Sequence, residues 1–567
     1  MKNINSEKII LLNLLTNYWF TIPEYQRSYV WQEDNVQELL DDVWSAFLED
    51  GQSEYFLGSL VLQQDDKINN YFDVLDGQQR LTTIILTLSV IKNIILEKND
   101  IIQKERNDLL STIKEVLYQG ENQFRNIKER VRIIFKIRDN VNDFVKNFIL
   151  PDNNTFQNIE SDIIKLADQT DNVSISNMAD AMITIKTFLI NKTTQQLIDF
   201  CKYFFNKIVF IYVSTAKFED AYRLFTIINN RGIPLTHSDI IKSINIGLID
   251  DQSKEKYSKE WEEIETDFNA NNFEGGFDRF LSHLRFVILK TKARKSLLDE
   301  FEENIYKTGK LKKGVDTIKF IKKFKSYYDE IIKLKSNSVD NNFKNLVTIM
   351  IEGIPSTEWM AALMKYYDKF NNNKIYEFLK LLEYKFSGDW IIDENPTARI
   401  NNLANILSAI ENSASPEILL QDKTIFNVDK TELHNKLDGN VYARKFSKYI
   451  LLKLEYIMAD NTIHFSNFKH ISVEHILPQK PDDNSMWVKI FNENEREFWT
   501  HKLANLILIN RIKNSSLGRL DYHAKKAKYF DKHISIFPRS CKLINQYNEW
   551  NTLILKNIQS ELLNKLI

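Results

Sequence analysis

Hydrophobic residues recur along the chain at two spacings, and these spacings predict both helices and strands. In the N-terminal part we predict helices at residues 6–17, 36–47 and 78–96, and strands at 55–62 and 71–75. Asp34 stands where it could cap the second helix. Residues 22–31 are an aromatic stretch that we expect to be extended, and Asp76-Gly77 marks a sharp turn before the long helix.

Helical spacing dominates from about residue 250 to residue 440. The predicted helices there are 257–268, 277–290, 315–334, 359–367 and 374–386. No residues in this region have catalytic spacing, and we expect the basic run at 307–314 to be a solvated loop. It is interpreted as a helical connector that could help to recognise DNA.

Two helices, 442–458 and 547–566, are predicted to open and close the C-terminal region. Between them, residues 473–476 and 503–509 are predicted as strands. We therefore predict an α+β, predominantly helical protein with three domains, residues 1–250, 251–440 and 441–567.

Composition narrows the classes of function. With 567 residues the chain is too long for one core, and 43% hydrophobic residues are enough to build several. Its 75 basic and 77 acidic residues nearly cancel, so any binding of nucleic acid must use local patches. Two cysteines, Cys201 and Cys541, exclude a zinc ribbon and a disulfide framework and suggest a reducing cytoplasm. The longest apolar block, residues 84–96, is too short for a membrane span, so we expect a buried helix and no membrane partner.

The most informative stretch is SVEHILPQ, residues 472–479, where Glu474 and His475 end an extended run that Pro478 stops. It is followed by HKLANLILINRIKN, residues 501–514. Hydrolysis of a phosphodiester needs a base for water and a divalent cation with open positions. Glu474, His475 and Asn514 could supply that set, although a lone His beside an apolar run is usually a core or surface residue, and asparagine is common in this chain.

Positive charge is concentrated in the same region, which favours a polyanionic substrate. Only Asp521 and Asp531 oppose eight basic residues between His501 and His533. The basic residues are Lys502, Arg511, Lys513, Arg519, Lys525, Lys526, Lys528 and Lys532.

These two C-terminal segments resemble the His-Asn-His (ββα-metal) nucleases. The resemblance implies that His475 is the general base, that Glu474 and Asn514 bind Mg²⁺ or another divalent cation, and that Asn505 braces the loop that orients His475. Lys526 is a weaker candidate for contact with a DNA phosphate. The acid is Glu where the family more often has Asp, and the last motif position is Asn rather than His, so the ligand set stays open.

A second candidate site lies in the N-terminal region. In LDGQQRLTT a carboxylate and a glycine precede a helix N-terminus, which favours an anion, and Arg80 adds a donor for phosphate oxygens. Arg27 and Arg231 also lie beside turn signals, and a helix is predicted to restart after Arg231 with Ser238 or Asp239 as its cap. A P-loop is excluded, but these residues alone could bind a nucleotide, grip DNA phosphates or brace a carboxylate network.

Three segments, IPEYQRSYVW, DGQQR and NNRGIPLTHSDIIK, resemble in sequence and order the N-terminal domain of GmrSD-type modification-dependent restriction systems. That domain is a ParB/sulfiredoxin-like module associated with nucleotide hydrolysis. The resemblance implies a nucleoside triphosphate site made of Gln26, Arg27, Asp76, Gly77, Gln78, Gln79, Arg80, Asn230, Arg231, Asp239 and Lys242.

Both resemblances together suggest a single-chain GmrSD-like (type IV) enzyme. The hypothesis is a metal-dependent endonuclease or nickase of anti-phage defence that cuts modified phage DNA under the control of a nucleotide. Two alternatives stay open: a nucleotide-switched DNA-binding regulator with an inactive nuclease fold, and a toxin-like nuclease. The sequence also leaves a homo-oligomer open.

Overall fold

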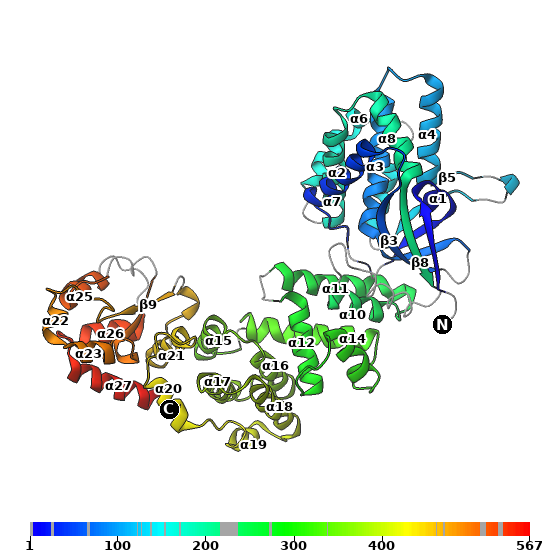
Figure 1. Cartoon of the computed structure of the whole chain (residues 1–567). Helices are drawn as coiled ribbons and strands as arrows, with labels where there is room; N and C mark the ends of the chain where they lie inside the picture. The colour runs from blue at the N-terminus through cyan, green and yellow to red at the C-terminus, as the bar shows by residue number, and fades with distance from the viewer. Residues whose placement is uncertain are drawn as a thin grey trace. The chain divides into compact units, whose positions relative to one another are not determined.

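The structure is a computed structural model of the whole chain (Figure 1). It describes residues 4–567 except 24, 25, 27, 65–68, 122, 126–127, 137–138, 152–154, 169–171, 216–235, 271–274, 337, 461, 469–470, 511–517 and 531–536. The contacts divide the chain into two compact units. Unit 1 is Met1–Glu263 with Lys313–Val315, and unit 2 is Ile264–Lys312 with Asp316–Ile567.

Unit 1 is built on a mixed sheet of six strands in the order β1-β8-β3-β4-β2-β7. The pairs β1–β8 and β3–β4 are antiparallel, whereas β8–β3, β4–β2 and β2–β7 are parallel. The strands are β1 (Asn5–Ile10), β2 (Trp19–Ile22), β3 (Tyr55–Gln64), β4 (Tyr71–Asp76), β7 (Ile133–Phe135) and β8 (Ile208–Thr215), with a small separate pair of β5 (Tyr118–Gln119) and β6 (Arg130–Val131).

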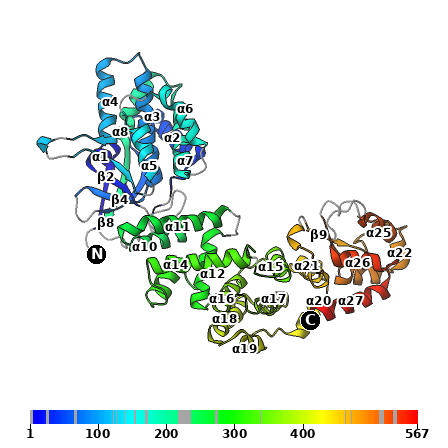
Figure 2. The same ribbon diagram turned by 180° about the vertical axis from the view of Figure 1, so that it is seen from behind.

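Helices pack beside this sheet (Figure 2), and one apolar core joins most of them to it, α10 and η1 excepted. They are α1 (Leu11–Asn17), α2 (Glu33–Glu49), α3 (Gln78–Glu97), α4 (Gln103–Leu117), α5 (Asp139–Phe144), α6 (Phe156–Ala167), α7 (Val173–Leu189), α8 (Thr194–Lys207) and α10 (His237–Ile246), with the short η1 (Gln123–Arg125) and η2 (Val145–Ile149). Helix α11 (Asp251–Ala270) crosses the boundary of the two units.

The predicted strands at 55–62 and 71–75 and the long helix at 78–96 are confirmed as β3, β4 and α3. The prediction of one helix over residues 6–17 is wrong in its first half, because residues 5–10 pair with β8 as a strand. Asp34 is not the cap of α2; Gln32 is, in a capping box with Asn35. Similarly, the cap of α10 is Thr236 rather than Ser238 or Asp239.

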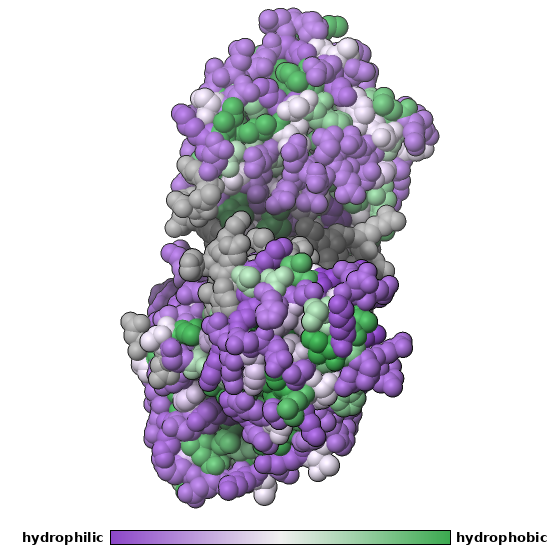
Figure 3. Space-filling model, turned by 90° about the vertical axis from the view of Figure 1, so that its left-hand side faces the viewer, coloured by the Kyte–Doolittle hydropathy of each residue, from purple (hydrophilic) through white to green (hydrophobic). Residues whose placement is uncertain are grey.

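Helix α3 is long and apolar enough to cross a membrane, but 89% of its apolar window is buried inside the protein. The predicted buried helix is therefore confirmed. The molecular face in Figure 3 is mostly hydrophilic, with hydrophobic residues in small areas.

Unit 2 contains the predicted helices of the middle region, except the one at 257–268 that lies in α11, and those of the C-terminal region. Its middle helices are α12 (Gly276–Leu289), α13 (Leu297–Asp299), η3 (Glu300–Tyr306), α14 (Val315–Tyr327), η4 (Tyr328–Ile332), α15 (Asn341–Gly353), α16 (Trp359–Phe370), α17 (Ile375–Ile391), α18 (Pro396–Asn412), α19 (Pro416–Gln421) and α20 (Lys430–Leu437). The elements that follow are α21 (Ser447–Met458), η5 (Phe465–Asn467), β9 (Ile471–His475), α22 (Met486–Ile490), α23 (Glu493–Trp499), η6 (Leu503–Asn505), β10 (Leu506–Asn510), α25 (Tyr522–Phe530), α26 (Pro538–Gln546) and α27 (Thr552–Leu566).

Helix α21 packs directly on the middle helices. The side chains of Asn341 and Asn345 on α15 donate to the carbonyl of Ile463, at 2.9 and 2.7 Å. Lys453 of α21 forms an ion pair of 2.9 Å with the buried Glu383 of α17. Middle and C-terminal helices thus share contacts inside one unit.

The two C-terminal strands pair antiparallel, with Leu506 opposite His475 and Ile507 opposite Glu474. The second strand begins at Leu506, three residues later than predicted, because 503–505 form a turn of 3-10 helix. The α+β, predominantly helical fold class is confirmed. The three domain boundaries, the ParB/sulfiredoxin-like module and the ββα-metal module stay predictions.

Candidate functional site

The C-terminal candidate site is built where β9 ends. Glu474 and His475 are the last two residues of this strand, and Asn505 directly precedes the paired strand β10. The backbone N–H of Ile476 donates to the carbonyl of Asn505 over 3.0 Å, so the pairing continues one step beyond the strand. The register therefore brings the predicted base and the predicted bracing residue together.

Asn505 is completely buried, and hydrogen bonds use both ends of its amide. Its Oδ1 accepts from the N–H of Leu477 at 2.7 Å and from Trp550 Nε1 at 3.3 Å. Its Nδ2 donates to the carbonyls of Leu477 and Thr500, at 2.9 and 2.8 Å. Asn505 thus binds both the N–H and the carbonyl of Leu477, two positions after His475, which is the geometry expected of a residue that braces this loop.

His475 is 5% exposed, and two side chains contact its ring nitrogens. Nε2 lies 3.1 Å from Nδ1 of His501, and Nδ1 lies 3.4 Å from Nε2 of Gln479. The amide nitrogen of Gln479 can only donate, so the nitrogen it meets is an acceptor. Neutral His475 therefore carries its proton on Nε2 and donates it to His501, which leaves Nδ1 as the basic nitrogen.

The surroundings keep His475 neutral. Burial lowers its pKa to about 3, and the nearby charges of His501 and Lys525 act in the same direction. Burial also lowers the pKa of His501. Tyr442 lies edge-on to the His475 ring, with centroids 4.2 Å apart, and stacks on His501 at 5.4 Å. Sequence analysis missed both Tyr442 and His501, for which no spacing gave a signal.

Glu474 is paired with a lysine that the sequence analysis did not select. Lys525 Nζ lies 2.8 Å from Glu474 Oε1 and donates to the carbonyl of His475 at 2.6 Å. Burial raises the pKa of Glu474, opposed by Lys525, and burial lowers the pKa of Lys525. The predicted Lys526 instead donates to the carbonyls of Asn545 and Tyr547, at 3.3 and 2.8 Å.

The α-helical spacing could have identified Lys525. Tyr522, Lys525 and Tyr529 are buried at positions i, i+3 and i+7 of α25, so they share the face that points inward. Lys526 lies beside that face, and its contact with a DNA phosphate stays a prediction.

Of the two predicted Mg²⁺ ligands, the structure describes only Glu474. Outside the gaps named above, no group of three or more His, Cys, Asp or Glu residues is placed to hold a metal ion. The predicted ligand Glu474 has an ammonium group on Oε1, where it would compete with a cation. The other predicted ligand, Asn514, lies outside the described residues. Mg²⁺ stays a prediction.

The N-terminal candidate site surrounds the start of α3. Gly77 has φ 95°, and a Cβ there would lie 2.1 Å from Leu60 Cδ2, so the turn requires glycine. Arg80 forms an ion pair of 3.3 Å with Asp76 and donates to the carbonyl of Leu57. Burial lowers the pKa of Arg80, opposed by Asp76. This is the pattern of a braced carboxylate, one of the alternatives the residues left open.

Two of the predicted glutamines bind backbone groups, Gln79 in the segment after β2 and Gln26 in β4. Gln79 accepts from the N–H of Val30 at 2.9 Å and donates to the carbonyl of Ser28 at 3.1 Å. Gln26 donates to the carbonyl of Leu75 at 3.1 Å, and Gln78 is 5% exposed. These contacts fix the aromatic stretch against the start of α3.

The remaining predicted residues of this site have other partners or lie outside the described residues. Asp239 accepts from the N–H and hydroxyl of Thr236 in a capping box, both at 2.9 Å. The buried Lys242 forms an ion pair with Glu262 at 3.0 Å. Arg27, Asn230 and Arg231 belong to the residues that the structure does not describe.

Two family models match the chain. "GmrSD restriction endonuclease, N-terminal domain" matches residues 10–246, and "GmrSD restriction endonucleases, C-terminal domain" matches residues 427–565. Together they cover more than half of the chain and both candidate sites. No curated protein matches it. The chain therefore belongs to the GmrSD family of restriction endonucleases.

Proposed function

We propose that the group around His475 hydrolyses DNA phosphodiester bonds, with His475 as the general base. Membership of a restriction endonuclease family makes DNA the substrate class. The observation that carries this assignment is a neutral imidazole held from two sides. Nε2 of His475 bonds to His501, and Asn505 holds the backbone of Leu477 in the turn that follows His475.

In this proposal water displaces the Gln479 amide from His475 Nδ1. Nδ1 then takes a proton from that water while the water oxygen attacks phosphorus and the P–O bond to the leaving oxygen breaks. The imidazolium that forms keeps its Nε2–H bond to His501. A pKa of about 3 makes a weak base in the free protein. A bound phosphate brings negative charge to the imidazolium, which raises this pKa toward the range where proton transfer at neutral pH is efficient.

Lys525 and Glu474 position the base in the proposed site. The ammonium group bonds to both the carboxylate of Glu474 and the carbonyl of His475, so it fixes the end of the strand that carries the imidazole. Mg²⁺ or another divalent cation, if bound, would supply stabilisation of charge at the scissile phosphate. No step is assigned to it, because the described ligand set is incomplete.

The regulatory part of the proposal concerns unit 1. We propose that a nucleoside triphosphate binds near Asp76 and Arg80 and that its binding or hydrolysis controls cutting of modified phage DNA in the cytoplasm. The support is a partly buried arginine held beside a helix N-terminus, where backbone N–H groups and the helix dipole favour an anion.

Cleavage of modified and unmodified plasmid DNA, with divalent cations and with or without each nucleoside triphosphate, tests the proposal. We expect His475→Ala to abolish strand scission while the fold is retained, and an equally active variant would refute the assignment. Phosphate release should disappear in Asp76→Ala and in Arg80→Ala. If both variants hydrolyse nucleotide normally, the nucleotide site lies elsewhere.

The same assay separates the alternatives. DNA binding without scission on any modified substrate or with any metal would indicate a regulator with an inactive nuclease fold. Preferential cutting of RNA, with toxicity on expression that His475→Ala removes, would indicate a toxin-like nuclease.

A further inference from the structure

A buried ion pair in unit 2 is formed by two residues that neither candidate site uses. Arg285 of α12 and Glu300 of η3 are 4% and 2% exposed, and their charged groups are 2.9 Å apart. Removing two charges from water costs several kcal/mol for each ion, and well-packed apolar residues often stabilise a fold at least as well. Stability alone therefore does not explain this pair, and its other hydrogen bonds show which part of the chain it holds.

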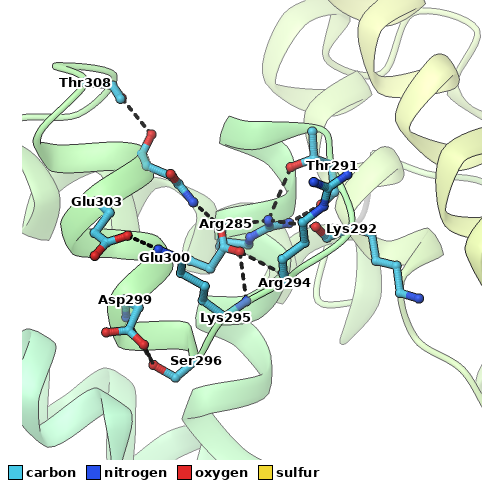
Figure 4. Close-up of polar contacts among 11 residues, drawn as sticks. Arg285, Thr291, Lys292, Arg294, Lys295, Ser296, Asp299, Glu300, Glu303 and Thr308 are labelled. Atoms are coloured by element: carbon cyan, nitrogen blue, oxygen red, sulfur yellow. Dashed lines mark hydrogen bonds and ion pairs between the residues drawn. The ribbon is translucent and has the colours of Figure 1, made fainter.

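Those bonds fix the backbone of the loop at residues 291–296 from two sides (Figure 4). Arg285 donates to the carbonyls of Thr291 and Lys292, the latter at 3.3 Å. Glu300 accepts from the N–H groups of Arg294 and Lys295, at 2.9 and 3.3 Å. Burial alone would raise the pKa of Glu300, but the Arg294 N–H and the other donors lower it to about 2, so the carboxylate stays charged.

The loop held in this way is exposed and basic. All six residues from Thr291 to Ser296 are exposed, and three of them are Lys292, Arg294 and Lys295. Lys295 is paired with Glu303. Lys292 points away from the buried pair, and among the residues described by the structure its ammonium group meets only the neutral hydroxyl of Thr397, at 2.8 Å. The guanidinium of Arg294 has no partner among the residues that the structure describes.

We propose that this loop is a contact surface for the DNA backbone, with Lys292 and Arg294 each meeting one phosphate. The inference rests on the proposed function only in taking DNA as the ligand. A fixed backbone lowers the entropy that must be lost when the two side chains dock. Two uncompensated charges on such a backbone suit a polyanion, and phosphate contacts position a protein on DNA without reading its sequence.

The test is DNA binding by the full chain carrying His475→Ala, which removes cutting from the measurement. Into this protein we introduce Lys292→Ser with Arg294→Ser. Each lost phosphate contact lowers the slope of log affinity against log salt by about 0.9, so we expect the slope to fall by about 1.8. Equivalently, the affinity ratio of parent to variant should shrink about 12-fold between roughly 50 and 200 mM salt.

Two matched variants make the result specific. Lys319→Ser with Lys423→Ser removes the same charge from two other exposed positions of unit 2 and should leave the slope unchanged. Lys292→Arg with Arg294→Lys keeps the charge and should retain the parent slope. Near-ultraviolet circular dichroism confirms the fold in each case.

A slope that does not change in the Lys292 and Arg294 double variant would overturn the inference, as would an equal loss in the Lys319 and Lys423 control. A parent chain that does not bind DNA would overturn it as well. Failure of the proposed catalytic site is seen separately, because it would appear as scission by the His475→Ala chain.

Discussion

His501 offers the sharpest perturbation of the proposed site. His501→Phe keeps a ring beside Tyr442 but removes the nitrogen that lies 3.1 Å from His475 Nε2. His501→Asn loses the ring but places an amide oxygen close to the former Nδ1, so it can still accept from Nε2–H. The two variants therefore separate the hydrogen bond from the packing.

The expected loss of rate follows from the strength of the His475–His501 hydrogen bond when His475 is protonated. When His475 takes a proton it becomes a cation, and hydrogen bonds to charged groups contribute about 1.5–3 kcal/mol. At about 1.36 kcal/mol for each factor of ten, His501→Phe should slow single-turnover cleavage by about 13- to 160-fold. DNA affinity should stay within about twofold, since the change acts on the proton transfer and not on a phosphate contact.

Single-turnover cleavage of a labelled duplex under saturating protein measures this rate directly. Recovery of most of the rate in His501→Asn would support a positioning role. The reasoning is refuted if His501→Phe cuts within about threefold of the wild type, or if Asn is as slow as Phe.

Three further predictions concern stability. Replacing the fully buried Asn505 by Ala leaves three backbone groups without partners at about 1–3 kcal/mol each, so urea unfolding should show a loss of at least about 3 kcal/mol; a loss below about 1 kcal/mol would contradict the brace. Gly77→Ala should destabilise the protein, because it adds the strain of a positive φ, about 1–2 kcal/mol, to a collision with Leu60. The control Gly120→Ala meets nothing within 4 Å and should be neutral. Equal melting temperatures of the two variants would contradict the turn at Gly77. Burial, helped by a nearby arginine, lowers the pKa of His283 to about 3. Because the unfolded state binds the proton first, stability should fall by up to about 1.4 kcal/mol for each pH unit from about 6.5 toward 3, and His283→Gln should flatten that profile.

Strongly patterned elements could be predicted from the sequence, and elements that depend on distant partners could not. The continuous apolar run of α3 identified a buried helix correctly. Residues 5–10 form a strand because β8, almost two hundred residues later, supplies their hydrogen bonds. Short-range periodicity has no access to such a pairing, and the run Leu11–Asn17 that follows is helical, which extended the predicted helix backwards.

The candidate site shows the same limit. The sequence predicted that Glu474, His475 and Asn505 lie together. They do, because the strand that ends in Glu474 and His475 pairs with the strand that Asn505 precedes. His501 and Tyr442 approach from segments with no regular spacing to the motif. Lys525 was not selected although it precedes the selected Lys526 by one position, because one position on a helix turns a side chain by about 100° and only Lys525 lies on the buried face.

The shared packing of α15, α17 and α21 has a practical consequence for dissecting the enzyme. A fragment that starts at residue 441 would strip Ile463 of both asparagine donors and leave Lys453 without Glu383. It would also uncover the flank of α21 that approaches Gly353, where a Cβ would lie only 2.8 Å from Tyr449 Cδ2. An excised C-terminal fragment should therefore begin before α15, so that the helices packed on α21 are expressed together with it.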